Sequence, residues 1–149
     1  MTRIPVITLA LLLSLHAAFA GNGKKTENEY VKVSVSLKER SLKPGETGEM
    51  LIAMRPKSGI HVNLQPPIDI KLDSNSAFAL VGGLHTSKGS KPEYLDASKP
   101  IRQTIKLKKT MKLGTTTVSG TLIYFYCSDA DGWCSRFKQP FTLTMSVSK

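Results

Sequence analysis

The fold of this chain is decided by residues 120–134, GTLIYFYCSDADGWC, which join an apolar strand to a hairpin tip and carry both cysteines. The strand is expected over residues 115–127, and the tip over residues 128–133. Apolar side chains fall on both faces of the strand: Ile123, Phe125 and Cys127 on one, and Leu122, Tyr124 and Tyr126 on the other. A strand covered on one side only would alternate with polar residues, so something must cover the second face. The candidate cover is the loop over residues 84–100 or a partner protein.

On either side of this stretch, apolar residues alternate with polar ones, which is the period of a half-buried strand. The expected strands cover residues 31–37, 50–56, 60–62, 68–72, 78–81, 101–107, 115–127 and 141–147. Glycine and proline mark the turns between them, and no segment after residue 20 has helical spacing. About eight short strands in a domain of this size predict an all-β, immunoglobulin-like antiparallel β-sandwich. A small barrel is the alternative.

Residues 1–20 have the pattern of a secretory signal peptide. Arg3 supplies the positive charge, residues 4–15 form the apolar core, and Ala18-Phe19-Ala20 is a small-x-small cleavage site. We therefore expect one mature domain over residues 21–149, exported and soluble, with the periplasm as its compartment. The apolar core is shorter than the roughly 20 residues needed to span a bilayer. In an exported chain, two cysteines most simply form one disulfide.

The formal net charge is +10, and lysines are densest in residues 106–112. We interpret these lysines as a solvated face, since the aromatic stacking positions of a nucleic-acid groove are absent beside them. No metal site is expected, because zinc ligands normally lie two to four residues apart and the cysteines are further apart. No small-molecule cofactor is expected either, and we expect a monomer.

The bridge between Cys127 and Cys134 has two interpretations. As a staple, it closes a short loop and stabilises the fold by roughly 2 to 3 kcal/mol. As a redox-active disulfide, it lies near a strand end and a hairpin tip, where the thiolate of another protein can attack one of its sulfurs. His61 is more simply a structural histidine than a base or a ligand, and Tyr124 and Tyr126 are either packing residues or docking contacts.

Several motifs occur together: residues 43–46 (KPGE), 51–54 (LIAM), 59–62 (GIHV), 120–127 (GTLIYFYC) and 132–134 (GWC). Together they resemble the periplasmic N-terminal domain of thiol:disulfide interchange proteins of the DsbD family. That resemblance implies an immunoglobulin-like sandwich whose cysteine pair accepts electrons from a membrane-embedded domain and passes them to periplasmic oxidoreductases. It also implies that Cys127 and Cys134 cycle between dithiol and disulfide. The sequence leaves open which of them is attacked; if the family pattern holds, we expect attack on Cys134, as the more exposed sulfur, with Cys127 as the resolving cysteine.

In that family a loop with acidic and aromatic residues caps the cysteine pair, and residues 92–95 look like its counterpart. The resemblance therefore implies that Glu93 and Tyr94 lie over the bridge, with Tyr124, Tyr126 and His61 as further supporting candidates. The family's membrane and thioredoxin-like domains do not follow in these 149 residues, so the expected electron donor is a separate membrane protein. Two hypotheses result: a thiol-disulfide interchange component, possibly acting as a protein-disulfide reductase, or a non-catalytic exported binding module with a structural disulfide.

Overall fold

The structure is a computed structural model that describes residues 26–149, and the expected signal peptide lies outside the described residues. The described part of the chain consists of nine strands and their connections. Over these residues, no helix is long and apolar enough to cross a membrane.

The strands form two sheets. The first is antiparallel and has the order β1 (Val31–Leu37), β3 (Thr47–Pro56), β7 (Ile101–Leu107), β6 (Phe78–His85). The second has the order β2 (Ser41–Leu42), β9 (Trp133–Val147), β8 (Gly114–Ser128), β4 (Ile60–Asn63), and β5 (Asp69–Leu72) also pairs with β8. Only the two-residue contact between β2 and β9 is parallel. The predicted all-β, immunoglobulin-like sandwich is thereby confirmed.

One hydrophobic core lies between the sheets, and the period-two patterns supply it. Met50, Ile52 and Met54 of β3 are buried, and the residues between them are half-buried. The same alternation in β7 buries Ile101 and Ile105. Burial of each such side chain is worth about 1.5 to 3 kcal/mol, so the core is a main source of the stability of the fold.

β6 and β9 extend furthest beyond the strands that the alternation predicts. β6 continues past Val81 to His85 through an irregularity at Gly82-Gly83, because a bulge keeps the strand beside β7. β9 begins at Trp133 rather than at residue 141, since it pairs with β8 along its whole length. Pro140 is tolerated within β9 because β2 reaches the other side of β9 only at Ser146 and Val147.

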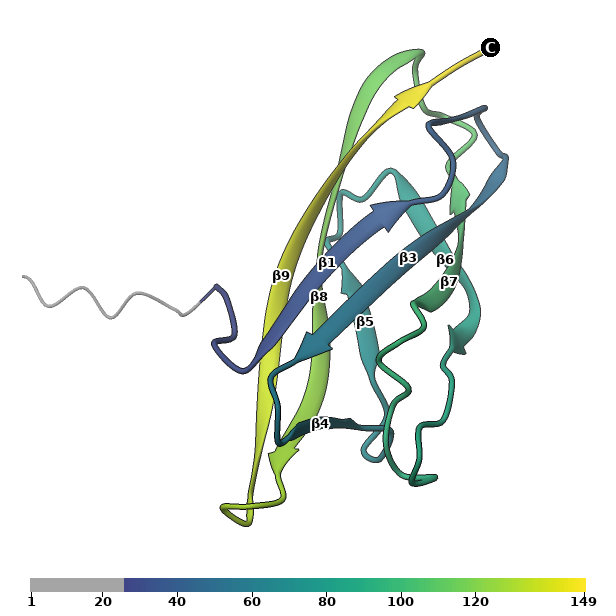
Figure 1. The fold of residues 1–149 in the computed structure, drawn as a ribbon. Coiled ribbons are helices and arrows are strands. Elements are labelled where there is room, and N and C mark those ends of the chain that lie inside the picture. The colour runs from purple at the N-terminus through teal and green to yellow at the C-terminus, as the bar shows by residue number, and fades with distance from the viewer. Residues whose placement is uncertain (1–25) are drawn as a thin grey trace, which may run out of the picture.

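The candidate site lies at the end of the molecule that carries the β8–β9 hairpin tip. Figure 1 shows this tip beside β4, at the opposite end from the C-terminus, with the loop between β6 and β7 descending towards the same end. The tip turns at Gly132, whose N–H donates to the carbonyl of Ser128 at 3.0 Å and whose φ is 66°. A positive φ favours glycine there. Three segments distant in sequence therefore meet around the cysteines.

Candidate functional site

The two cysteines form a disulfide across the β8–β9 hairpin. Cys127 and Cys134 are direct cross-strand partners, and their Cα atoms are 4.1 Å apart. Cys127 is 5% exposed, whereas Cys134 is an exposed residue. The bridge therefore presents one of its cysteines to solvent and keeps the other covered.

A hollow of about 340 Å³ opens beside the bridge, and we call it the cysteine hollow. Residues of β4, of the β6–β7 loop and of the hairpin line it: His61, Asn63, Glu93, Tyr94, Cys127, Ser128, Asp129, Gly132, Trp133 and Cys134. His61 lies opposite Cys127 in the β4–β8 register, and Asn63 lies opposite Phe125. Cross-strand partners share a face, so β4 places both polar side chains on the face that carries the bridge.

Tyr94 anchors the β6–β7 loop on this face. Its ring stacks on the His61 ring with centroids 3.6 Å apart, and its hydroxyl donates to Asp129 Oδ1 at 3.1 Å. Two backbone hydrogen bonds also join the loop to the β4 segment, from Leu64 N–H to the Glu93 carbonyl and from Leu95 N–H to the Val62 carbonyl. The loop thus covers part of the second face of β8, and both Glu93 and Tyr94 border the cysteine hollow.

A short polar chain runs along the outside of this anchor. Lys91 donates to the Tyr94 hydroxyl at 3.2 Å, and that hydroxyl in turn donates to Asp129. The hydrogen bond to Tyr94 raises the pKa of Lys91, and the nearby Asp129 carboxylate adds to the effect. His61 Nδ1 lies 3.5 Å from the other Asp129 oxygen. Asp129 therefore ties the hairpin tip to both the loop and β4.

Asn63 contacts the bridge itself. Its side-chain N–H donates to Cys127 Sγ, with 3.2 Å between nitrogen and sulfur. The other end of the same amide, Oδ1, is buried and has no hydrogen-bond partner among the described residues. An unpaired buried carbonyl destabilises a fold by about 1 to 3 kcal/mol, so this orientation of the Asn63 amide lowers the stability of the domain.

The structure does not bring Tyr124 and Tyr126 to the cysteine hollow. Both point into the core on the other face of β8, where Tyr124 is fully buried and accepts a hydrogen bond from the Asn28 amide at 3.0 Å. Burial raises the pKa of Tyr124 to about 12. Tyr126 packs edge-on against Trp133, which also packs against Tyr30. These aromatic residues support the hairpin from behind.

Two residues of the site were not singled out from the sequence for the contacts they make. Asn63 and Asp129 are ordinary polar residues in the sequence, and only the β4–β8 register brings Asn63 within reach of Cys127. A weak sequence indication exists, since His61 and Asn63 are two residues apart and must share a strand face. Over residues 26–149, no cluster of three or more His, Cys, Asp or Glu residues is placed to hold a metal ion.

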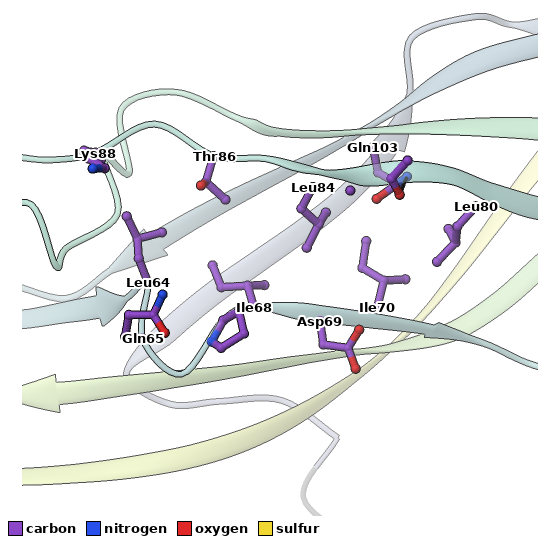
Figure 2. A pocket seen from close by; sticks show the side chains of 13 residues that line it. Leu64, Gln65, Ile68, Asp69, Ile70, Leu80, Leu84, Thr86, Lys88 and Gln103 are labelled. Atoms are coloured by element: carbon purple, nitrogen blue, oxygen red, sulfur yellow. Dashed lines mark hydrogen bonds between the residues drawn. The ribbon is translucent and has the colours of Figure 1, made fainter.

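A larger hollow, of about 490 Å³, lies away from the cysteines, on the side of the sandwich formed by β5 and β6. Figure 2 shows the side chains that line it, among them Leu64, Ile68, Ile70, Leu80 and Leu84. Neither cysteine nor any histidine is part of its lining. We therefore take the cysteine hollow, and not this larger hollow, as the candidate functional site.

No protein family model matches the chain, and no curated protein matches it. Among solved structures, the cohesin module of a family 33 glycoside hydrolase from Clostridium perfringens aligns with a TM-score of 0.48 at 9% identity, covering 80% of this chain and 97% of that one. A cohesin–dockerin complex from Clostridium thermocellum aligns at 0.42 and 10% identity, with 82% and 99% covered. AggA, the major subunit of aggregative adherence fimbriae from Escherichia coli, aligns at 0.36 and 10% identity, with 79% and 95% covered. The function has to be inferred from the chain's own residues.

Proposed function

We propose that this domain is a periplasmic thiol-disulfide exchange domain, which passes electrons between a membrane electron donor and periplasmic oxidoreductases through Cys127 and Cys134. One observation carries the proposal: the bridge has one exposed and one covered cysteine and borders a hollow under an anchored loop. The motifs that resemble the N-terminal domain of the DsbD family, and the signal-peptide pattern of residues 1–20, support the same function.

The exchange balances as two thiol-disulfide steps. A thiolate of a partner dithiol bonds to Cys134 Sγ, the bond between the two sulfurs breaks, and Cys127 leaves as a thiolate. The partner's second thiolate then attacks the mixed disulfide, which releases Cys134 and leaves the partner oxidised. Two electrons thus enter the domain, and solvent supplies the protons of the two thiols. The reverse sequence delivers the electrons to an oxidised acceptor.

The loop that carries Glu93 and Tyr94 supports this function because it borders the cysteine hollow, where it would restrict the approach of a thiol to the bridge. A structural disulfide needs no such control, whereas a carrier gains from reacting with its partners and not with every small thiol. The backbone hydrogen bonds of Glu93 and Leu95 hold the loop in place, and the contacts of Tyr94 with His61 and Asp129 close it.

A direct test is electron transfer between proteins. The reduced domain is mixed with an oxidised thioredoxin-fold oxidoreductase, samples are quenched with an alkylating reagent, and the thiols of both proteins are counted. We expect the oxidoreductase to gain two thiols as the domain loses two. The matched control carries Cys127→Ser and Cys134→Ser and should transfer nothing. If the dithiol domain transferred no more than this control, the proposal would be wrong.

A second candidate function is a non-catalytic exported binding module whose bridge is a staple. The observation that favours it is the position of the bridge, which joins direct cross-strand partners at the end of two paired 15-residue strands. A bond there holds the hairpin in register. In this case the protein partners would bind without reducing the bridge, and binding would survive the replacement of both cysteines by serine.

A further inference from the structure

We propose that Asn63 is a catalytic residue of the exchange: its side-chain N–H holds Cys127 Sγ as the leaving group, so that the incoming thiolate bonds to Cys134. This inference rests on the proposed function and concerns a residue that the sequence did not single out. It starts from the 3.2 Å hydrogen bond between Asn63 Nδ2 and Cys127 Sγ.

The first step of the argument is the asymmetry of that hydrogen bond. The Asn63 amide donates to Cys127 Sγ and not to Cys134 Sγ. When a thiolate attacks a disulfide, negative charge develops on the sulfur that leaves. A donor already aimed at that sulfur stabilises the charge as it forms, and a hydrogen bond to a charged group is stronger than one to a neutral group. The donor at Cys127 therefore favours Cys127 as the leaving sulfur.

Exposure points in the same direction. The attacking thiolate must reach the sulfur it bonds to, and Cys134 is exposed whereas Cys127 is 5% exposed. A thiolate formed at Cys127 would be largely shielded from water, so a donor from the protein would stabilise it. Asn63 is placed to supply it, because the β4–β8 register sets its side chain on the face of Cys127.

The unpaired Asn63 Oδ1 supplies the third step. In the disulfide state this buried oxygen has no partner among the described residues, since a bridge sulfur carries no proton. After reduction, a half-turn of the amide would bring Oδ1 to the position of Nδ2, where a protonated Cys127 thiol can donate to it. One amide can thus serve both forms of the reduced cysteine, as donor to the thiolate and as acceptor from the thiol. The oxidised domain carries the cost of the unpaired oxygen, and the reduced domain can recover it.

The test isolates Cys127 in the reduced state. In a Cys134→Ser background, the rate of Cys127 alkylation by iodoacetamide is measured against pH, with Asn63 intact, as Asn63→Leu and as Asn63→Asp. Both replacements remove the N–H and keep a similar side-chain volume. We expect the midpoint pH of alkylation to rise by about one unit for leucine, and by more for aspartate, whose carboxylate repels the thiolate. Asn75→Leu, in an exposed turn, is the matched control and should leave the midpoint unchanged.

A second measurement follows the complete bridge. In the domain with both cysteines, we expect Asn63→Leu to slow reduction by glutathione about tenfold, while the thermal midpoint of the oxidised domain stays the same or rises. A residue that merely packs would lower the thermal midpoint and leave the alkylation profile in place. An unchanged alkylation midpoint in both Asn63 variants would overturn the inference. Its failure is distinct from failure of the proposed function, which would appear as a wild-type bridge that transfers no electrons to a partner.

Discussion

The contacts of Tyr94 lead to the most detailed prediction, which concerns access to the bridge. Tyr94→Ala removes the stack on the His61 ring and the hydrogen bond to Asp129, and leaves the two backbone hydrogen bonds of the loop in place. The loop should remain folded but open more often. Because an attacking thiolate must approach along the axis of the bridge, more frequent opening should speed reduction.

The magnitude follows from the two lost contacts. An aromatic stack is worth about 0.5 to 1.5 kcal/mol beyond its area, and a hydrogen bond in a partly exposed position about as much. Their sum is about 1 to 3 kcal/mol. The Asp129 side chain is largely exposed, which favours the lower half of that range. Because about 1.4 kcal/mol corresponds to a tenfold change in rate, Tyr94→Ala should speed reduction of the bridge about tenfold. Tyr94→Phe keeps the ring and loses only the hydroxyl, so its effect should be about two- to fivefold.

The assay is the pseudo-first-order rate of reduction by excess glutathione, stopped by alkylation and read as free thiols. The expected order of rates is Tyr94→Ala, then Tyr94→Phe, then wild type. Lys88→Ala, an exposed position in the same loop outside the cysteine hollow, is the control and should match wild type. If Tyr94→Ala reduced at the wild-type rate while remaining folded, the reasoning that the loop restricts access would be refuted.

Three further predictions concern stability. Gly120→Ala should destabilise the domain by about 1 to 3 kcal/mol in urea, because the added Cβ would lie 2.7 Å from the Lys71 carbonyl oxygen; a stability equal to wild type would contradict the packing described for β8. Replacing Cys127 and Cys134 by serine should lower the free energy of unfolding by about 2 to 3 kcal/mol in the same assay, since the bridge joins residues seven positions apart. We expect the domain to remain folded after this loss because its hydrophobic core is intact. Tyr124 keeps its proton up to about pH 12 in the folded state and only to about pH 10 when unfolded, so its contribution to stability should be constant below pH 10 and fall between pH 10 and 12. Tyr124→Phe should show a smaller loss of stability over that window, and an identical loss would refute the assignment.

The fold could be predicted from the sequence wherever one face of a strand is buried. The alternation in residues 31–37 and 101–107 corresponds to β1 and β7 with the same bounds. The first half of β9 could not be predicted, because residues 133–140 have no clean alternation and include Pro140. Its strand conformation comes from pairing with β8, which is a long-range contact. β2 could not be predicted either, since two residues are too few for a pattern.

The candidate site could be predicted in part. The apolar residues on both faces of residues 122–127 indicate a cover, and the structure supplies part of it from the β6–β7 loop through Tyr94. The hydrogen bond from Asn63 to Cys127 could not be predicted, because it depends on the register between β4 and β8, which local sequence does not encode. For Tyr124 the sequence allowed a docking contact, because an aromatic side chain lies close to Cys127 at the end of a strand. The structure instead buries Tyr124 in the core, because the pleat of β8 directs its side chain to the other face.

The reduction potential of the Cys127–Cys134 bridge tests the central claim most directly. The purified domain is equilibrated with glutathione or dithiothreitol buffers of stepped potential, and free thiols are trapped and counted at each step. A carrier should titrate between about −120 and −270 mV, the range of cellular thiol oxidoreductases. A bridge that stays closed until the potential falls below about −300 mV behaves as a structural disulfide, and that result would contradict the exchange function.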